Sequence, residues 1–290
     1  MGILDSNVSL LFPVWDSYLV KYAIHSVIYF LKEKGDYMLD FNKDTLFHIG
    51  LCPEQGASLA ILTGDPGRVE EIARKFDDPV FVASNREFTT WAAQTAGKRL
   101  LVTSHGIGGP STAICIEELY RCGVRTMIRV GTCGGMQMPV MGGDVVIATG
   151  AIRQEGTTGD YLPLAFPAVA DFTVTQVLTE AAKELKQRYY TGVVHCKDSF
   201  YGQHDPAASP VAYQLENQWH AWIKGGCLAS EMESAALFIL GAVKGIRTGC
   251  VLQVLWNQER AAAGLANPQV TTAEGAVEVA VKAVKSKALF

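Results

Sequence analysis

The sequence predicts an α/β fold with three layers, α/β/α, built on a central mixed β-sheet. Short apolar runs of strand length alternate along the 290 residues with longer segments of helical periodicity, which is typical of this class. One further segment, Arg86–Gly97, alternates polar and apolar residues like a half-exposed strand and ends at a Gly-Lys turn. Half-exposed strands are common in antiparallel pairs, so we expect part of the sheet to be antiparallel.

The apolar runs are the predicted buried strands. Each is bounded by turn or helix signals, and each is too short to be an independent helix. They are Leu59–Thr63, Leu100–Ser104, Thr126–Val130, Val145–Thr149, Thr191–Cys196 and Cys250–Leu255.

The predicted helices have recognisable ends. Pro110 precedes a helix over Ser111–Cys122, and a glycine follows it. A second helix presents one apolar face between Met232 and Val243, again before a glycine. The last helix is expected over Thr272–Lys287. Residues 1–46 lack this strand-turn-helix rhythm, so we predict an N-terminal extension over 1–46 and a single domain over 47–290.

Composition excludes several classes of partner. The net charge of -4 gives no long-range attraction to nucleic acid or to an acidic membrane surface. No stretch is apolar enough over sufficient length to span a bilayer. The seven cysteines are scattered singly and form no CxxC pair, which favours a reducing, cytoplasmic compartment. We therefore expect a protein that binds small molecules and has no nucleic-acid or membrane partner.

Three glycine-containing turns follow predicted strands. In open α/β sheets such exits converge on a ligand crevice, where backbone amides favour an anion. None of them matches a dinucleotide fingerprint or a P-loop, so no bound nucleotide cofactor is expected. They are Gly64-Asp-Pro-Gly-Arg68, His105-Gly-Ile-Gly-Gly-Pro-Ser111 and Thr132-Cys-Gly-Gly135.

Several of these residues also have purely structural interpretations. The turn before Arg68 is first of all a tight turn that leads into a helix. Arg129 lies inside an apolar strand, where it needs either a buried carboxylate or a bound anion. Ser230-Glu-Met-Glu233 fits a capping box, in which Ser230 caps a helix and Glu233 reaches back to its amide.

Seven ordered motifs together resemble the nucleoside phosphorylase-I family, and the resemblance covers nearly everything after residue 46. The motifs are Phe47-His-Ile-Gly-Leu51, Gly64-Asp-Pro-Gly-Arg-Val69, Asn85-Arg-Glu-Phe-Thr-Thr-Trp91, Gly106-Ile-Gly-Gly-Pro-Ser-Thr112, Ile128-Arg-Val-Gly-Thr132, Asp198-Ser-Phe-Tyr-Gly-Gln203 and Glu231-Met-Glu-Ser-Ala235. The resemblance implies the family's three-layer fold and its reaction, in which inorganic phosphate displaces the base of a nucleoside. Phosphate is then a co-substrate, and no other cofactor is required.

The resemblance also implies a phosphate site. Arg68 and Arg129 would clamp the phosphate, assisted by Gly64 and Thr132, and Arg86 would reach in from a partner subunit. A guanidinium fork matches phosphate geometry well. Of these residues, Arg129 and Thr132 are expected to act in catalysis, together with Glu233 of the ribose site.

For the ribose, the resemblance implies Met232 and Glu233, with His48 offered by the partner subunit. Sharing His48 and Arg86 requires at least a homodimer, and a hexamer remains open. Positions that match a monovalent-cation site at the dimer interface of some bacterial relatives are Glu87, Ile107 and Ser111.

Base recognition is expected from Phe200 and Gln203, whose amide pairs with both a donor and an acceptor on the uracil edge. Trp256-Asn-Gln258 carries no acid where purine-specific relatives place an aspartate, so uridine is the leading substrate, with deoxyuridine and thymidine open. The arginine that usually follows the glutamine is missing, which leaves Arg260 or His204 as its replacement.

The alternatives to a uridine-cleaving phosphorylase are a purine nucleoside phosphorylase, a hydrolytic nucleosidase and a non-catalytic nucleoside-binding relative.

Overall fold

The computed structural model describes residues 45–290. The chain divides into two units, Met1–Lys43 and Asp44–Phe290. All but the last two residues of the predicted extension over 1–46 lie outside the described residues, so that boundary stays a prediction.

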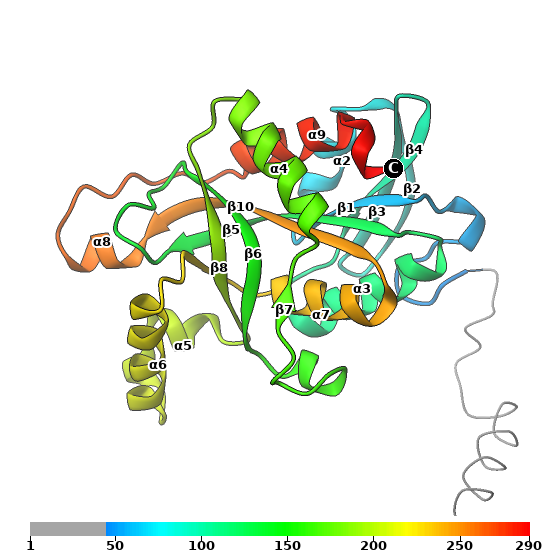
Figure 1. The fold of residues 1–290 in the computed structure, drawn as a ribbon. Helices are drawn as coiled ribbons and strands as arrows, with labels where there is room; N and C mark the ends of the chain where they lie inside the picture. Colours follow the sequence, from blue (N-terminus) through cyan, green and yellow to red (C-terminus); the bar gives the residue numbers. More distant parts are fainter. Residues whose placement is uncertain (1–44) are drawn as a thin grey trace, which may run out of the picture. The chain divides into compact units, whose positions relative to one another are not determined.

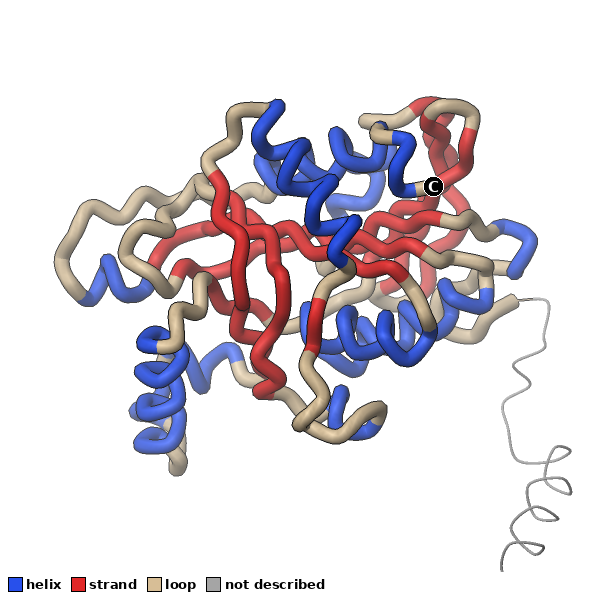
Figure 2. Tube along the Cα trace, in the orientation of Figure 1, coloured by secondary structure: helices blue, strands red, loops and turns tan. Residues whose placement is uncertain are grey.

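Ten strands of the described residues form one mixed sheet (Figures 1 and 2). Strand β3 runs antiparallel to both of its neighbours, β2 and β4, which confirms the expectation for Arg86–Gly97. The strands are β1 Leu59–Thr63, β2 Asp77–Asn85, β3 Phe88–Thr95, β4 Lys98–Ser104, β5 Thr126–Gly135, β6 Val145–Gln154, β7 Ala168–Val169, β8 Tyr189–Lys197, β9 Ala229–Glu231 and β10 Arg247–Asn257.

Helices cover both faces of the sheet, so the predicted α/β/α arrangement is confirmed. Helices α2, α4 and α9 lie above the sheet in Figure 1, and α3 and α7 lie below it, while α5 and α6 pack together at one end. The helices are α2 Gly67–Ala73, α3 Gly109–Arg121, α4 Phe172–Glu184, α5 Phe200–His204, α6 Ala212–Lys224, α7 Ser234–Lys244, α8 Gln258–Ala262 and α9 Glu274–Lys285.

The two helical layers enclose separate apolar cores. Along β1, Leu59 and Ile61 pack into the core beneath α2, α4 and α9, whereas Ala60 and Leu62 pack into the core beneath α3 and α7. This alternation follows from the two-residue period of a strand. A strand buried on both faces has no solvent-exposed positions, which is why its sequence is an almost continuous apolar run.

The sheet closes on itself at one end. Strand β5 pairs with both β9 and β10, and β6 and β8 complete a ring of five strands in the order β5–β10–β6–β8–β9. The N-terminal half of β5, Thr126–Val130, also pairs with β1, but this pairing stops where β1 ends. Beyond that point Gly131–Cys133 keeps β10 on one side and has no strand from residues 45–290 on the other. This gap is where a site can open.

Two local predictions are corrected. Thr132–Gly135 is not a turn, because β5 continues through it by pairing with β10 and β9. The helix for which Ser230 was the predicted cap begins three residues later than expected, at Ser234, with Glu233 as its first flanking residue, since Ser230 and Glu231 are part of β9. Pairing between segments far apart in sequence decided both cases.

Helix α4 packs closely on β10 at Gly249. A Cβ at this position would overlap Cγ1 of Val174 and lie 3.1 Å from Cδ1 of Leu178. We expect Gly249→Ala to lower the free energy of unfolding by about 1–3 kcal/mol, as overpacking usually does. Urea unfolding is the measurement, with Gly159→Ala as the control because nothing lies within 4 Å of its added Cβ. Equal stability of the two variants would contradict the close packing.

Candidate functional site

A pocket of about 720 Å³ opens beside the unpaired stretch of β5. Its walls come from the ends of β1 and β4, from the β9–α7 junction and from α5. Of the residues predicted from sequence, it is lined by Gly64, Arg68, Glu87, Ile107, Ser111, Arg129, Thr132, Phe200, Gln203, Met232 and Glu233. Strand ends that are remote in sequence therefore converge here, as expected for an α/β sheet.

One part of the pocket, here called the arginine end, contains Gly64, Arg68, Arg129 and Thr132. Asp65 accepts a 2.8 Å hydrogen bond from the amide of Gly67, so this segment does form the tight turn that leads into α2. The nearest carboxylate oxygen to the Arg68 guanidinium is 3.7 Å away, on Asp65. The turn thus places Arg68 at the pocket, where its guanidinium forms only a weak ion pair with Asp65.

Arg129 is almost fully buried, with 3% of its surface exposed. Its Nη2 atom pairs with Glu233 and lies 3.2 Å from Oε2 of Glu231. Burial lowers the pKa of the guanidinium, but the two carboxylates more than offset this, so the pKa is raised and the group stays charged. Both Nε and Nη1 are buried without a hydrogen-bond partner in the described residues. Of the two partners considered for Arg129 from sequence, the buried carboxylate is present. The Nε and Nη1 donors remain for the other, a bound anion.

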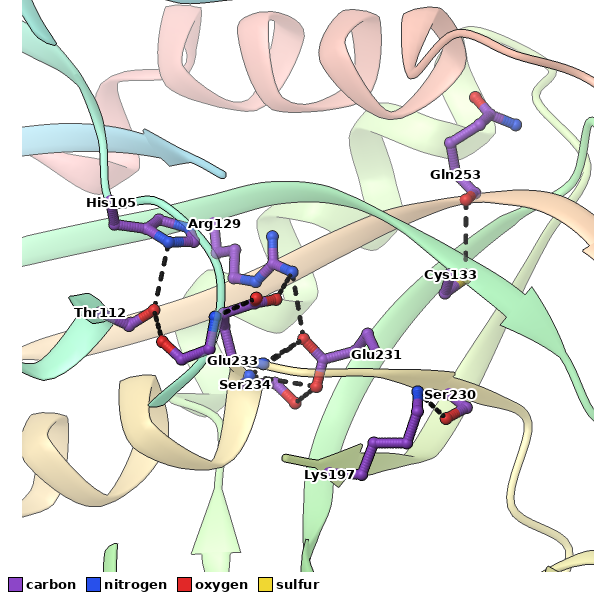
Figure 3. Close-up of polar contacts among 11 residues, drawn as sticks. His105, Thr112, Arg129, Cys133, Lys197, Ser230, Glu231, Glu233, Ser234 and Gln253 are labelled. Carbon is purple, nitrogen blue, oxygen red and sulfur yellow. Dashed lines mark hydrogen bonds and ion pairs between the residues drawn. The ribbon is translucent and has the colours of Figure 1, made fainter. Parts of the chain in front are cut away.

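Two carboxylates fix the start of α7 (Figure 3). Glu231 accepts hydrogen bonds from the amides of Glu233 and Ser234 and from the Ser234 hydroxyl. Glu233 accepts a 2.7 Å bond from the amide of Gly108. The capping-box interpretation is therefore wrong: the acceptor for the first amides is Glu231, and Ser230 lies in β9. Glu233 instead joins Arg129 to the loop before α3.

The other part of the pocket, here called the glutamine end, contains Lys197, Phe200, Gln203, His204 and Ser230. Gln203 accepts a 2.8 Å bond from the Ser230 hydroxyl and donates a 3.0 Å bond to Gln258. The rings of Phe200 and His204 lie 4.3 Å apart between centroids. An oriented amide beside aromatic rings is suited to a flat heterocycle with polar edges.

Lys197 was missed by sequence reasoning. It is the last residue of β8 and is only 6% exposed. The sequence offered one signal, a lysine directly after the apolar run Thr191–Cys196, but a strand-end lysine is ordinarily solvated.

His48 and Arg86 do not line the pocket of their own chain. Arg86 is exposed at the β2–β3 turn, with φ of 55°. His48 contacts Glu118 through Nδ1 at 2.7 Å. Asn85 donates to the carbonyl oxygens of Phe47 and His48, so the two residues predicted to serve a partner subunit lie near one another.

Arg260 is not brought to the pocket either. Its guanidinium donates to the carbonyl oxygens of Ala266 and Met138, both at 2.7 Å. His204, the other residue considered at this point, does line the pocket, and burial followed by the charge of Lys197 lowers its pKa.

The three positions considered for a cation lie together at the pocket wall. The Ser111 hydroxyl, which has a single hydrogen to donate, lies 2.8 Å from Oε1 of Glu87 and 2.5 Å from the carbonyl oxygen of His105. Hard cations need several oxygen ligands, and the described residues contain no group of three or more His, Cys, Asp or Glu side chains that could hold a metal. This site stays a prediction.

Comparison with known proteins places this geometry in context. The model of the phosphorylase superfamily matches residues 58–287. A uridine phosphorylase of Treponema pallidum (strain Nichols) is 53% identical over 247 residues, which cover 85% of this chain and 96% of that protein. A uridine phosphorylase of Escherichia coli (strain K12) is 42% identical over 249 residues, covering 84% and 98%. A guanosine phosphorylase of Halorubrum lacusprofundi is 40% identical over 196 residues, covering 68% and 77%.

The match extends over the strands, helices and pocket walls described above, and it agrees with the resemblance seen in the seven motifs. The chain belongs to the phosphorylase superfamily.

Proposed function

We propose that the protein catalyses phosphorolysis of uridine, giving uracil and ribose 1-phosphate. The observation that carries this proposal is the buried Arg129, whose Nε and Nη1 have no hydrogen-bond partner within residues 45–290, in a pocket that also contains Arg68. A hydrolase or a passive binder has no need for two guanidinium groups at one end of its site. The uridine phosphorylases among the relatives support the choice of base.

At the arginine end, Arg68 and Arg129 bind the phosphate dianion, with Thr132 and the backbone at Gly64 as further donors. Arg86 of the partner subunit adds a third positive charge. Glu233 and Met232 hold the ribose, and His48 of the partner subunit binds its 5′ hydroxyl. Phosphate held beneath C1′ meets the positive charge that develops on the sugar as the glycosidic bond breaks.

Gln203 explains a preference for uracil. Ser230 occupies one lone pair of its Oε1, and Gln258 takes one of its Nε2 hydrogens. One lone pair and one N–H remain on the same amide. They match the N3–H donor and the neighbouring carbonyl of uracil, whereas cytosine has no hydrogen on N3. We therefore expect uridine to be cleaved and cytidine to be rejected.

Asn257 disfavours a purine substrate. It is fully buried, and its side chain donates to the carbonyls of Gln137 and Val140 and accepts from the amide of Arg260. Every polar atom of the side chain is thus used to hold the loop after β10. No acid is available at this position to protonate a purine.

The assembly that we propose is at least a two-fold dimer, because Arg86 and His48 lie outside the pocket of their own chain. A hexamer and an interface cation at Glu87, Ile107 and Ser111 are compatible with this assignment. No helix in residues 45–290 is long and apolar enough to cross a membrane. The cysteines are all unpaired, which supports a cytoplasmic location.

The direct test is release of uracil from uridine with and without inorganic phosphate. Phosphorolysis requires phosphate, and product analysis should give equal amounts of uracil and ribose 1-phosphate. Release without phosphate would identify a nucleosidase, and binding without release would identify a non-catalytic relative. Inosine and cytidine in parallel test the choice of base, deoxyuridine tests the sugar, and thymidine tests the sugar together with a methylated base.

Arg68→Ala should weaken phosphate binding without unfolding the protein. Within residues 45–290 the ion pair of this side chain is a single long one, to Asp65, so we expect stability to change by no more than about 0.5 kcal/mol. Loss of one charged donor should raise the KM for phosphate on the order of tenfold or more. The matched control is Arg74→Ala, which removes an exposed arginine paired with Glu70 outside the pocket. A normal phosphate KM in Arg68→Ala would refute its role.

Gly131→Ala should displace the Arg129 guanidinium. A Cβ at this position would overlap Nη1 of Arg129 and lie 2.7 Å from its Cζ. Overpacking against a buried ion pair should lower the free energy of unfolding by about 1–3 kcal/mol. Gly134→Ala on the same strand should leave stability unchanged or slightly raised, since nothing lies within 4 Å of its added Cβ. Urea unfolding of both variants distinguishes this clash from a general intolerance of side chains on β5.

A further inference from the structure

Lys197 is a buried cation that the phosphate and ribose assignments do not use. Its Nζ donates a 2.9 Å hydrogen bond to the Ser230 hydroxyl. Within residues 45–290 this is the only hydrogen-bond acceptor of the ammonium group. An ammonium has three N–H donors, so two of them are left for another molecule. Because Lys197 lines the pocket, those donors have access to a bound ligand.

The charges around Lys197 set its state. Burial lowers its pKa, and the carboxylates of Glu231 and Glu233 act in the opposite direction. The titratable and charged groups that face it from its own strand and from neighbouring elements are Cys133, His195, Cys196, His204, Glu231 and Glu233. A buried ammonium with a single hydroxyl partner is poorly compensated. A ligand that brings a carbonyl oxygen or negative charge completes its surroundings.

The position of the ammonium shows which part of a ligand it meets. Ser230 joins Lys197 to Gln203, through contacts of 2.9 Å and 2.8 Å. One hydroxyl oxygen therefore separates Nζ from the amide proposed to bind the base. In Figure 3, Lys197 and Ser230 lie on the opposite side of Glu231 from Arg129. Lys197 belongs to the glutamine end, away from the phosphate clamp.

We propose, on the basis of the uridine assignment above, that Lys197 binds a carbonyl oxygen of uracil and stabilises the negative charge that the base acquires as it leaves. In this step a phosphate oxygen forms a bond to C1′ and the bond from C1′ to N1 of the base breaks. The electron pair of the broken bond passes to N1 and spreads over the carbonyl oxygens. Lys197 keeps its proton, and the released base takes its proton on N1 from water.

This assignment supplies the second base contact that the sequence leaves open. Arg260 is held by two backbone carbonyls, and the pKa of His204 is lowered, which favours its neutral form. Lys197 is the charged donor that the pocket places next to Gln203. It takes over the task of the arginine that is missing after Gln203 by approaching from strand β8 instead of from the loop.

The test compares Lys197→Met, which keeps the length of the side chain and removes the charge, with Lys197→Arg, which keeps the charge. We expect Lys197→Met to lower kcat/KM for uridine on the order of 10- to 100-fold, the loss typical of one charged hydrogen bond. The KM for phosphate should change less than about twofold, because the arginine end is intact. Lys197→Arg should retain part of the activity. Lys75→Met is the control, a lysine paired with Glu278 outside the pocket.

Two readouts separate this role from a structural one. With 5-fluorouridine, whose base is a better leaving group, Lys197→Met should lose less activity relative to wild type than it does with uridine. The kcat/KM of the wild type should also fall as pH rises through the lowered pKa of Lys197, since the protonated form is the active one. The variant should lack this part of the alkaline decline.

Each outcome decides the question. An equal loss with both nucleosides, a raised phosphate KM or an unchanged uridine kcat/KM would overturn the role of Lys197 while leaving phosphorolysis intact. A wild type that releases no uracil from uridine would overturn both proposals. If Lys197→Met does not fold, the role of the charge is tested by the activity of Lys197→Arg and by the alkaline decline of the wild type. A folded but inactive Lys197→Arg, together with a wild type that shows no such decline, would reject the role of Lys197.

Discussion

The buried contact of Arg129 with Glu231 and Glu233 is the constraint on which this site depends. It ties the middle of β5 to the end of β9 and to the first residue before α7. Removing one member would leave a charge buried without a partner, which is strongly destabilising. The same contact sets the direction of the guanidinium, so that stability and anion binding rely on one side chain.

Charge is balanced locally around the pocket. Arg129 and Lys197 are buried cations, and Glu231 and Glu233 are buried carboxylates beside them. The deepest part of the pocket is therefore close to neutral, and the more exposed Arg68 adds positive charge at its edge. The proposed phosphate site thus gains its positive charge at the pocket edge and needs no strongly basic surface. A chain with a net charge of -4 can bind an anion in this way.

Much of the fold followed from local patterns. The predicted strand Leu59–Thr63 has the same first and last residues as β1. A strand buried on both faces is recognised from its short, almost continuous apolar run. The end of β5, the closure of the ring and the use of Glu231 at α7 depend on pairing between distant segments, which no local window contains. Lys197 was overlooked for the same reason: its hydrogen-bond partner is Ser230 of β9, which is remote in sequence. The roles of Arg86 and His48 came from family resemblance alone.

Ring closure also determines where the sheet can meet another chain. Strand β10 is paired on both sides, and β5 is paired on both sides except over Gly131–Cys133. Within residues 45–290 the longest strand at an edge of the sheet is therefore β2. That strand opens with Asp77-Asp78-Pro79, whose charges and missing amide hydrogen oppose the addition of a further strand. Its other end carries Asn85, next to Arg86. The start of this strand thus discourages edge-to-edge aggregation, and its other end carries the residues of the proposed subunit contact.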